Sequence, residues 1–159
     1  EAQAEIDKLL NIKGKRTIID FHRTLGKIVW DKIGISRNKE GLEEAIKEIQ
    51  ALREEFWTNV FVPGDKNNYN KYLEYAFRLA DYFELAELMA KDALQREESC
   101  GCHLREEYQT EEGEALRNDK DFAYVAAWEY QGVNGELKTT MHKEDLNFEF
   151  VELKQRSYK

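Results

Sequence analysis

Apolar residues recur every three or four positions from residue 17 to residue 96, which is the spacing of helices with one buried face. The pattern is interrupted at Gly34 and at Pro63-Gly64-Asp65, residue types that end helices. It predicts three long helices in succession, at residues 17–33, 38–62 and 70–96. Because each has one apolar face, we expect a spectrin-repeat-like three-helix bundle around a shared core.

The first predicted helix has recognisable start and stop signals. Thr17 is a residue type that caps helix N-termini, and Gly34 suits a left-handed stop. Ile19, Trp30 and Ile33 are expected to widen the buried face beyond a single stripe.

The third predicted helix carries large side chains on more than one face. Its main stripe is rich in alanine, which allows a neighbouring helix to approach closely. Further apolar and aromatic residues lie outside that stripe: Tyr72, Tyr75, Phe77, Tyr82 and Leu85. Either a second packing partner covers them, or the tyrosine rings lie half covered with their hydroxyls in water.

The pattern changes after residue 96. Residues 121–143 predict two strands joined by a turn at Asn134-Gly135, and Tyr124, Ala126, Trp128 and Tyr130 would share one face. Residues 147–159 alternate apolar and polar and predict a last extended strand or tail. The expected fold is therefore mainly α, a three-helix bundle with a small β-hairpin and an extended C-terminal appendage.

The expected division of the chain has three parts. Residues 17–96 form the bundle, and residues 97–159 form a charged loop with a β-containing C-terminal extension. Residues 1–16 begin at Glu1 in what resembles an amphipathic helix entered part-way. We interpret them as the helical remnant of a preceding domain and the chain as a fragment of a longer protein; a trimmed N-terminus is the alternative.

Composition narrows the classes of function. The net charge of −8 argues against a nucleic-acid partner, because phosphate binding depends on clustered Lys and Arg. No apolar run approaches the roughly 18–20 residues that cross a bilayer, and no signal segment is recognisable. Two cysteines exclude a disulfide framework, so a reducing, intracellular setting is expected.

The chemistry-bearing residues concentrate in REESCGCHLREEYQ, residues 96–109. Attachment of c-type haem needs C-x-x-C-H, and Cys100-Gly101-Cys102-His103 is one residue short. A zinc site needs about four converging ligands, whereas Cys100, Cys102 and His103 are crowded together. A Cys100–Cys102 disulfide would close a very small, strained ring. A reactive thiolate needs nearby positive charge, and the neighbouring glutamates make the local charge balance unfavourable for one.

The rest of the sequence offers no second centre of chemistry. His22 and His142 stand alone on a predicted helix and strand, and nothing matches a G-x-G-x-x-G phosphate loop. Composition and spacing by themselves therefore predict an acidic helical domain with an unusual charged loop.

The charged loop resembles the Arg-x-Glu-Ser-x-Gly-x-His-x-Arg segment in the C-terminal helical domain of the succinate dehydrogenase/fumarate reductase flavoprotein subunit. The matching positions are Arg96, Glu98, Ser99, Gly101, His103 and Arg105. The family's helix junction with its Gly-Ile-x-Arg signature is similar to Trp30, Gly34, Ile35, Arg37, Leu42, Ala45 and Leu52, and ELKQRSYK is similar to its closing segment. Common members have Arg and Ala in place of Cys100 and Cys102. The long acidic loop is similar to the long-chain branch, usually linked to menaquinone.

The resemblance implies a parent that interconverts succinate and fumarate on a covalently held FAD. Its flavin and substrate motifs lie upstream, so no catalytic, cofactor-binding or metal residue is assigned to this chain. The implied partners are the upstream flavin-binding and capping domains, an iron–sulfur subunit and, indirectly, a membrane anchor subunit on the cytoplasmic side of the inner membrane. The implied interface residues are Arg37, Arg96, Glu98, Ser99, His103 and Arg105.

On this interpretation residues 96–109 form a structural docking loop in which His103 is a hydrogen-bonding member and Cys100 and Cys102 are half-buried fillers. Three alternatives remain open. One is the C-terminal domain of a related flavoprotein, aspartate oxidase or adenylylsulfate reductase. The others are a free-standing helical protein-interaction module and a thiol or metal sensor at Cys100, Cys102 and His103.

Overall fold

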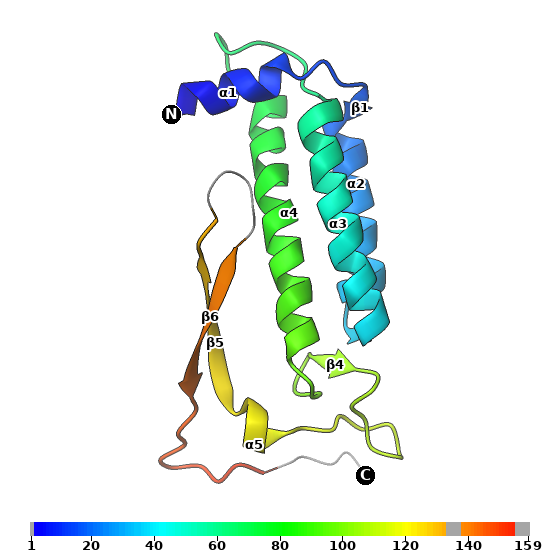
Figure 1. Cartoon of the computed structure of the whole chain (residues 1–159), viewed down its shortest axis with the longest axis vertical. Coiled ribbons are helices and arrows are strands. Elements are labelled where there is room, and N and C mark those ends of the chain that lie inside the picture. Colours follow the sequence, from blue (N-terminus) through cyan, green and yellow to red (C-terminus); the bar gives the residue numbers. More distant parts are fainter. Residues whose placement is uncertain (1, 133–137, 155–159) are drawn as a thin grey trace. The chain divides into compact units, whose positions relative to one another are not determined.

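The computed structural model describes residues 2–132 and 138–154, and the chain divides into two compact units, residues 1–95 and 96–159. The first unit holds the long helices of Figure 1. Its elements are α1 Ala2–Asn11, β1 Arg16–Thr17, α2 Ile18–Ile28, the π-helix η1 Val29–Ile33, β2 Ser36–Arg37, α3 Lys39–Asn59, β3 Val60–Phe61 and α4 Lys71–Gln95. Those of the second unit are β4 Leu104–Arg105, α5 Asp119–Phe122, β5 Tyr124–Tyr130 and β6 Thr139–Asp145. The predicted fold class is confirmed.

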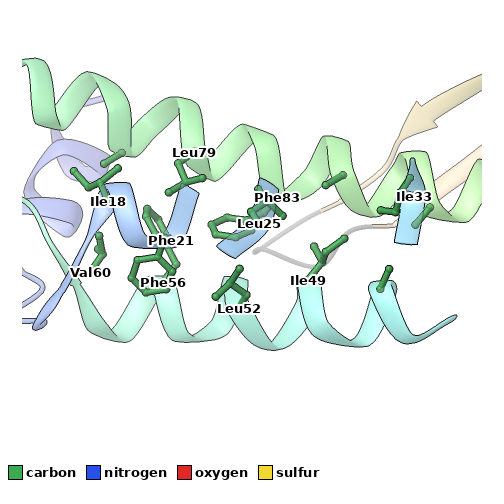
Figure 2. Close-up of a cluster of buried hydrophobic side chains, with 14 of the residues drawn as sticks. Ile18, Phe21, Leu25, Ile33, Ile49, Leu52, Phe56, Val60, Leu79 and Phe83 are labelled. Atoms are coloured by element: carbon green, nitrogen blue, oxygen red, sulfur yellow. The ribbon is translucent and has the colours of Figure 1, made fainter. Parts of the chain in front are cut away.

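The core of the first unit lies between α2, α3 and α4 (Figure 2). One phenylalanine from each helix meets at its centre. The rings of Phe21 and Phe56 lie 5.5 Å apart edge to face, and those of Phe56 and Phe83 lie 5.4 Å apart. All three side chains are fully buried, so the aromatic cluster fixes the mutual packing of the helices.

Short strands close one end of this bundle. Arg16 of β1 pairs with Val60 of β3 in parallel, which places the start of α2 beside the end of α3 and makes the two helices antiparallel. Leu9 of α1 is fully buried in the same core. Helix α1 therefore packs as part of the first unit, while its origin in a preceding domain stays a prediction.

The first predicted helix is confirmed at its start and corrected at its end. The Thr17 hydroxyl accepts a hydrogen bond from the Asp20 amide at 3.1 Å, as an N-cap does. The left-handed stop at Gly34 was wrong, because Gly34 has φ −55°. A Cβ there would lie 2.5 Å from the Trp30 carbonyl oxygen, so close approach and not handedness requires the glycine.

The expected widening of the buried face was wrong at two positions. Ile33 is buried, but Ile19 and Trp30 are 49% and 82% exposed. The buried stripe continues through Leu25, Val29 and Ile33, and Trp30, one residue on from Val29, points away from it. On α4, Tyr72, Tyr75 and Tyr82 are each about two-fifths to one-half exposed and Leu85 is 54% exposed, so a second packing partner and half-covered rings both stay open as interpretations.

The second unit contains the predicted hairpin. Strands β5 and β6 pair antiparallel from Tyr124 opposite Asp145 to Tyr130 opposite Thr139. The predicted turn at Asn134-Gly135 lies outside the described residues. Strand alternation places Tyr124, Ala126, Trp128 and Tyr130 on one face, as predicted, and Tyr130 at the end of that face is 53% exposed. The last described residues, 147–154, contain no strand, because none of them joins a ladder.

Candidate functional site

The segment of residues 96–105, called here the 96–105 segment, is built around a tight turn. Cys100 and His103 exchange two backbone hydrogen bonds, of 2.9 and 3.0 Å. Gly101, inside the turn, has φ +61°, a conformation that favours glycine. The Ser99 amide donates to the Leu116 carbonyl at 2.9 Å, which holds the base of the turn against the chain that follows.

Arg96 and Glu98 join this segment to the start of the hairpin. Arg96 Nη1 donates to Glu98 Oε1 at 2.7 Å and to the Phe122 carbonyl at 3.1 Å, and Nη2 donates to the Tyr124 carbonyl at 3.1 Å. The other Glu98 oxygen accepts from the Asn118 amide at 2.9 Å. The Glu98 side chain is 3% exposed, so its charge is enclosed by these donors.

Ser99 and Arg105 form the inner part of the network. The Ser99 hydroxyl accepts from the Arg105 amide at 2.9 Å and donates to the Arg105 carbonyl at 3.1 Å. The Arg105 side chain is 2% exposed, with Nε donating to Glu107 Oε2 at 3.2 Å and the guanidinium 5.4 Å from the centroid of the Tyr108 ring. A buried guanidinium is costly unless paired, and these contacts offset that cost.

His103 and the two cysteines differ in their exposure within the turn. His103 Nε2 lies 3.0 Å from the Arg96 carbonyl oxygen, and because a carbonyl only accepts, Nε2 carries a hydrogen. The hydrogen-bonding role predicted for His103 is confirmed. Cys100 and Cys102 are exposed free thiols, so their description as half-buried fillers was wrong.

The predicted interface residues fall into both units. Five of them, Arg96, Glu98, Ser99, His103 and Arg105, meet in the single network of the second unit. Arg37 lies on β2 of the first unit, where its Nε donates to the Gly34 carbonyl at 3.1 Å. Their contact with a partner stays a prediction.

The isolated histidines each have a local neighbour. His22 stacks on Tyr82 with ring centroids 6.0 Å apart. His142 Nε2 lies 2.8 Å from Glu129 Oε2, and this contact, with a second hydrogen bond from Gln131, holds the pKa of the Glu129 carboxyl below its usual value. Over residues 2–132 and 138–154, no group of three His, Cys, Asp or Glu side chains is placed to hold a metal ion.

One buried charged residue was missed by the sequence analysis. Glu87 of α4 is 1% exposed and accepts from Gln50 at 2.8 Å, Arg53 at 2.8 Å and Lys91 at 2.7 Å. Burial raises the pKa of Glu87, but the hydrogen bonds from Lys91 and Gln50 and the charges of Lys91 and Arg53 outweigh it, so the pKa is lowered. The available signal was its position on the apolar stripe, four residues after Phe83.

The polar groups are satisfied within the chain. Among the described residues, no buried side-chain nitrogen or oxygen lacks a hydrogen-bond partner. In the 96–105 segment, buried side chains hydrogen-bond to the segment's own backbone or to the chain that follows it. The Ser99 hydroxyl, the Glu98 carboxylate and the Arg96 and Arg105 guanidinium groups are all engaged in internal hydrogen bonds.

Fold and network together define a helical accessory domain followed by a charged turn and a hairpin. The chain belongs to the family described as Fumarate reductase flavoprotein C-term, whose model matches residues 22–158. The resemblance of the 96–105 segment to this family is thereby confirmed.

Similar curated proteins support this family assignment. The chain is 33% identical over 114 residues to an uncharacterized FAD-dependent oxidoreductase of Methanocaldococcus jannaschii, covering 68% of this chain and 20% of the relative. It is 31% identical over 118 residues to the fumarate reductase flavoprotein subunit of Helicobacter pylori, covering 74% of this chain and 16% of the relative. The chain thus spans about a fifth or less of the length of these relatives.

Solved structures share the fold. A variant of Escherichia coli quinol fumarate reductase FrdA superposes with a TM-score of 0.79 at 23% identity, covering 96% of this chain and 25% of that one. The Mycobacterium smegmatis Sdh1 complex gives 0.76 at 22% identity, covering 92% and 24%. Within the described part of the chain, no helix has the length and apolar character needed to cross a membrane.

Proposed function

We propose that this chain is the C-terminal helical domain of an FAD-dependent flavoprotein subunit that interconverts succinate and fumarate. In this proposal FAD and substrate bind to the remainder of the parent polypeptide. Electrons pass to an iron–sulfur subunit and then, through a membrane anchor subunit, to quinone at the cytoplasmic side of the inner membrane. The match of the family model to residues 22–158 carries the proposal.

The chain's own role is structural docking, and it is inactive alone. The 96–105 segment supports this role, because its buried side chains fix the backbone and leave the turn at residues 100–102 exposed. The proposed interface comprises that segment, with Arg96, Glu98, Ser99, His103 and Arg105 as its supporting network, together with Arg37.

The C-terminal extension supplies a second docking element. The Leu146 amide donates to the Ala123 carbonyl at 2.9 Å, and Arg117 Nη1 donates to the Lys154 carbonyl at 3.1 Å, so this stretch is anchored at both ends. Between the anchors, Phe148 is 49% and Phe150 is 89% exposed. Apolar side chains exposed together in this way mark interaction sites.

Activity of the parent tests the proposed reaction. The full-length protein, isolated with its FAD, is assayed for fumarate reduction with a reduced viologen dye and for succinate oxidation with an electron-accepting dye. We expect turnover of this pair by the parent and none by residues 1–159 alone. A parent that binds FAD but turns over neither compound would contradict the proposal.

One relative supports a second candidate. The chain is 35% identical over 83 residues to L-aspartate oxidase of Vibrio cholerae, covering 50% of this chain and 14% of the relative. The same purified parent is therefore assayed for oxidation of L-aspartate. Oxidation of L-aspartate without succinate oxidation would favour this candidate.

Docking is tested with two fragments. The upstream part of the parent is produced separately and its affinity for residues 1–159 is measured. Phe150→Ala, which removes the more exposed of the two phenylalanine rings between the anchors, is expected to weaken binding by about 10-fold or more. Val125→Ala, at a 52% exposed position on β5, is the control and should bind like the unmodified chain. Equal affinity of Phe150→Ala and the unmodified chain would remove the extension from the interface.

A further inference from the structure

Helix α4 carries a second line of large side chains outside its buried stripe, called here the outer seam. Its members follow one another at alternating intervals of three and four residues: Tyr75, Arg78, Tyr82, Leu85 and Met89. All five are exposed, from 38% for Tyr75 to 60% for the Arg78 side chain. Alternation of three and four is the spacing of a seam that packs against another helix, and the outer seam is separate from the buried stripe through Leu79 and Phe83.

A hollow of about 330 Å³ lies beside the outer seam, between α4 and α2. It is lined by the buried Ile18 and Leu79 and by the exposed Ile19, Tyr75 and Tyr82. The apolar surface at this place therefore extends over two helices. Exposed apolar side chains that gather in this way mark a surface that another protein surface covers.

The outer seam is complementary to itself when two copies of α4 run antiparallel. It is symmetric about residue 80, so Tyr75 of one copy lies opposite the partner's Leu85, and Arg78 lies opposite the partner's Tyr82. The first pair is an apolar contact, and the second is a cation–π contact. A parallel pair of helices would instead set Arg78 against the partner's Arg78, and like charges repel.

The charge beside the outer seam agrees with the antiparallel order. Asp81 is exposed and lies next to the seam, near its centre of symmetry. In an antiparallel pair, Arg78 of each copy lies within one helical turn of the partner's Asp81. The two ion pairs offset the approach of the two Asp81 carboxylates near the symmetry axis. Such local pairing is needed, because each chain has a net charge of −8.

We propose that a second copy of this chain binds the outer seam, with the two α4 helices antiparallel and related by a two-fold axis near residue 80. The surface contains none of the residues of the proposed docking interface, and the proposal needs only this chain, so it stands apart from the proposed function. The outer seam is about 21 Å long at a rise of about 1.5 Å per residue. An interface of this size is small, so we expect a Kd of about 10–100 µM.

Analytical ultracentrifugation of residues 1–159 at increasing concentration, from about 1 to about 500 µM, measures the association. The mass should rise from 18.8 kDa, that of one chain, toward twice this value. Leu85→Glu places a carboxylate opposite the partner's Tyr75 and should weaken association by about 10-fold or more. Ile35→Glu is the matched control, because Ile35 is an exposed aliphatic residue outside α4, and it should associate like the unmodified chain.

An exchange of charges tests the antiparallel register. Arg78→Glu sets a carboxylate against the partner's Asp81, and Asp81→Arg sets a guanidinium against the partner's Arg78. Each variant alone should therefore associate about 10-fold or more weakly than the unmodified chain. In an equimolar mixture the introduced glutamate of one variant faces the introduced arginine of the other, so the mixture should associate more strongly than either component.

Several results would overturn the proposal. A mass of one chain at every concentration would show that no second copy binds. A dimer that Leu85→Glu leaves intact would place the contact elsewhere, and a mixture no stronger than its components would exclude the antiparallel register. If the chain stays monomeric and Leu85→Glu loses affinity for the upstream part of the parent, the outer seam belongs to a contact within the parent. Circular dichroism checks that each variant keeps its fold.

Discussion

At the scale of single residues, Glu87 is the strongest test of the packing of α4. Its carboxylate is enclosed by Gln50, Arg53 and Lys91 at 2.7–2.8 Å. Glu87→Gln keeps the shape but removes the charge that pairs two cations. Since Arg53 and Lys91 are 17% and 29% exposed and can turn toward water, we expect a loss of about 1–3 kcal/mol in the free energy of unfolding.

Urea unfolding followed by circular dichroism measures this loss. Asp81→Asn is the matched control, because Asp81 is an exposed carboxylate on the same helix, and it should change stability by less than about 0.5 kcal/mol. Equal stability of the two variants would mean that the Glu87 charge contributes nothing net.

The lowered pKa of Glu87 gives this contribution a pH dependence. An unfolded Glu titrates near about 4.3. Because the folded carboxyl titrates below that value, its contribution is complete above about pH 4.3 and is lost as the pH falls through the folded pKa. The stability difference between the unmodified chain and Glu87→Gln should therefore stay constant from about pH 7 to 5.5 and shrink below about pH 4. A difference that grows on acidification would contradict the assigned direction of the shift.

At the scale of elements, Gly26 within α2 and Gly34 after η1 should respond in opposite ways to substitution by alanine. A Cβ at Gly26 of α2 meets nothing within 4 Å, so Gly26→Ala should stabilise the chain by about 0.5–1 kcal/mol through helix propensity. A Cβ at Gly34 lies 2.5 Å from the Trp30 carbonyl oxygen, so Gly34→Ala should destabilise it by about 1–3 kcal/mol. Thermal unfolding of both variants in parallel gives the two signs. Destabilisation by both would show that the end of η1 is not the special position.

The helices were predictable because their boundaries depend on local chemistry. Thr17 caps α2, the Asn38 side chain accepts from the Gly41 amide at 2.8 Å, and Asn70 caps the first amides of α4. The exposure of Trp30 was not predictable, because the inserted π-helical turn depends on tertiary packing and has no periodic signal.

The residues that form the site could be predicted from the sequence, but the exposure of each side chain could not. The 96–105 segment was identified by its motif, and the hydrogen bond of His103 was expected. The exposure of each residue in the turn depends on the left-handed backbone at Gly101 and on partners distant in sequence, such as Leu116 for the Ser99 amide. This is why the exposure of Cys100 and Cys102 was missed.

At the scale of the whole molecule, the two compact units are stabilised by different kinds of interaction. The first unit has the large apolar core, whereas the second is held mainly by the polar network and the hairpin. In the second unit, Glu98 accepts hydrogen bonds from the Arg96 side chain and from the Asn118 amide. A substitution of Glu98 therefore weakens contacts both at the start of the 96–105 segment and in the chain before β5.

Glu98→Gln removes the charge of this buried link while keeping its size. Because the Arg96 guanidinium then loses its ionic partner, we expect amide hydrogen exchange in β5 and β6 to become faster by roughly 10- to 100-fold, which corresponds to about 1.4–2.8 kcal/mol. Amides of α3 and α4 facing the Phe21, Phe56 and Phe83 cluster should keep their rates. Glu144→Gln, at an exposed position of β6 in the same hairpin, is the control and should leave both sets nearly unchanged. Equal acceleration in the hairpin and the bundle would show a single cooperative unit, and the second unit would then owe its stability to the apolar core and not to its own network.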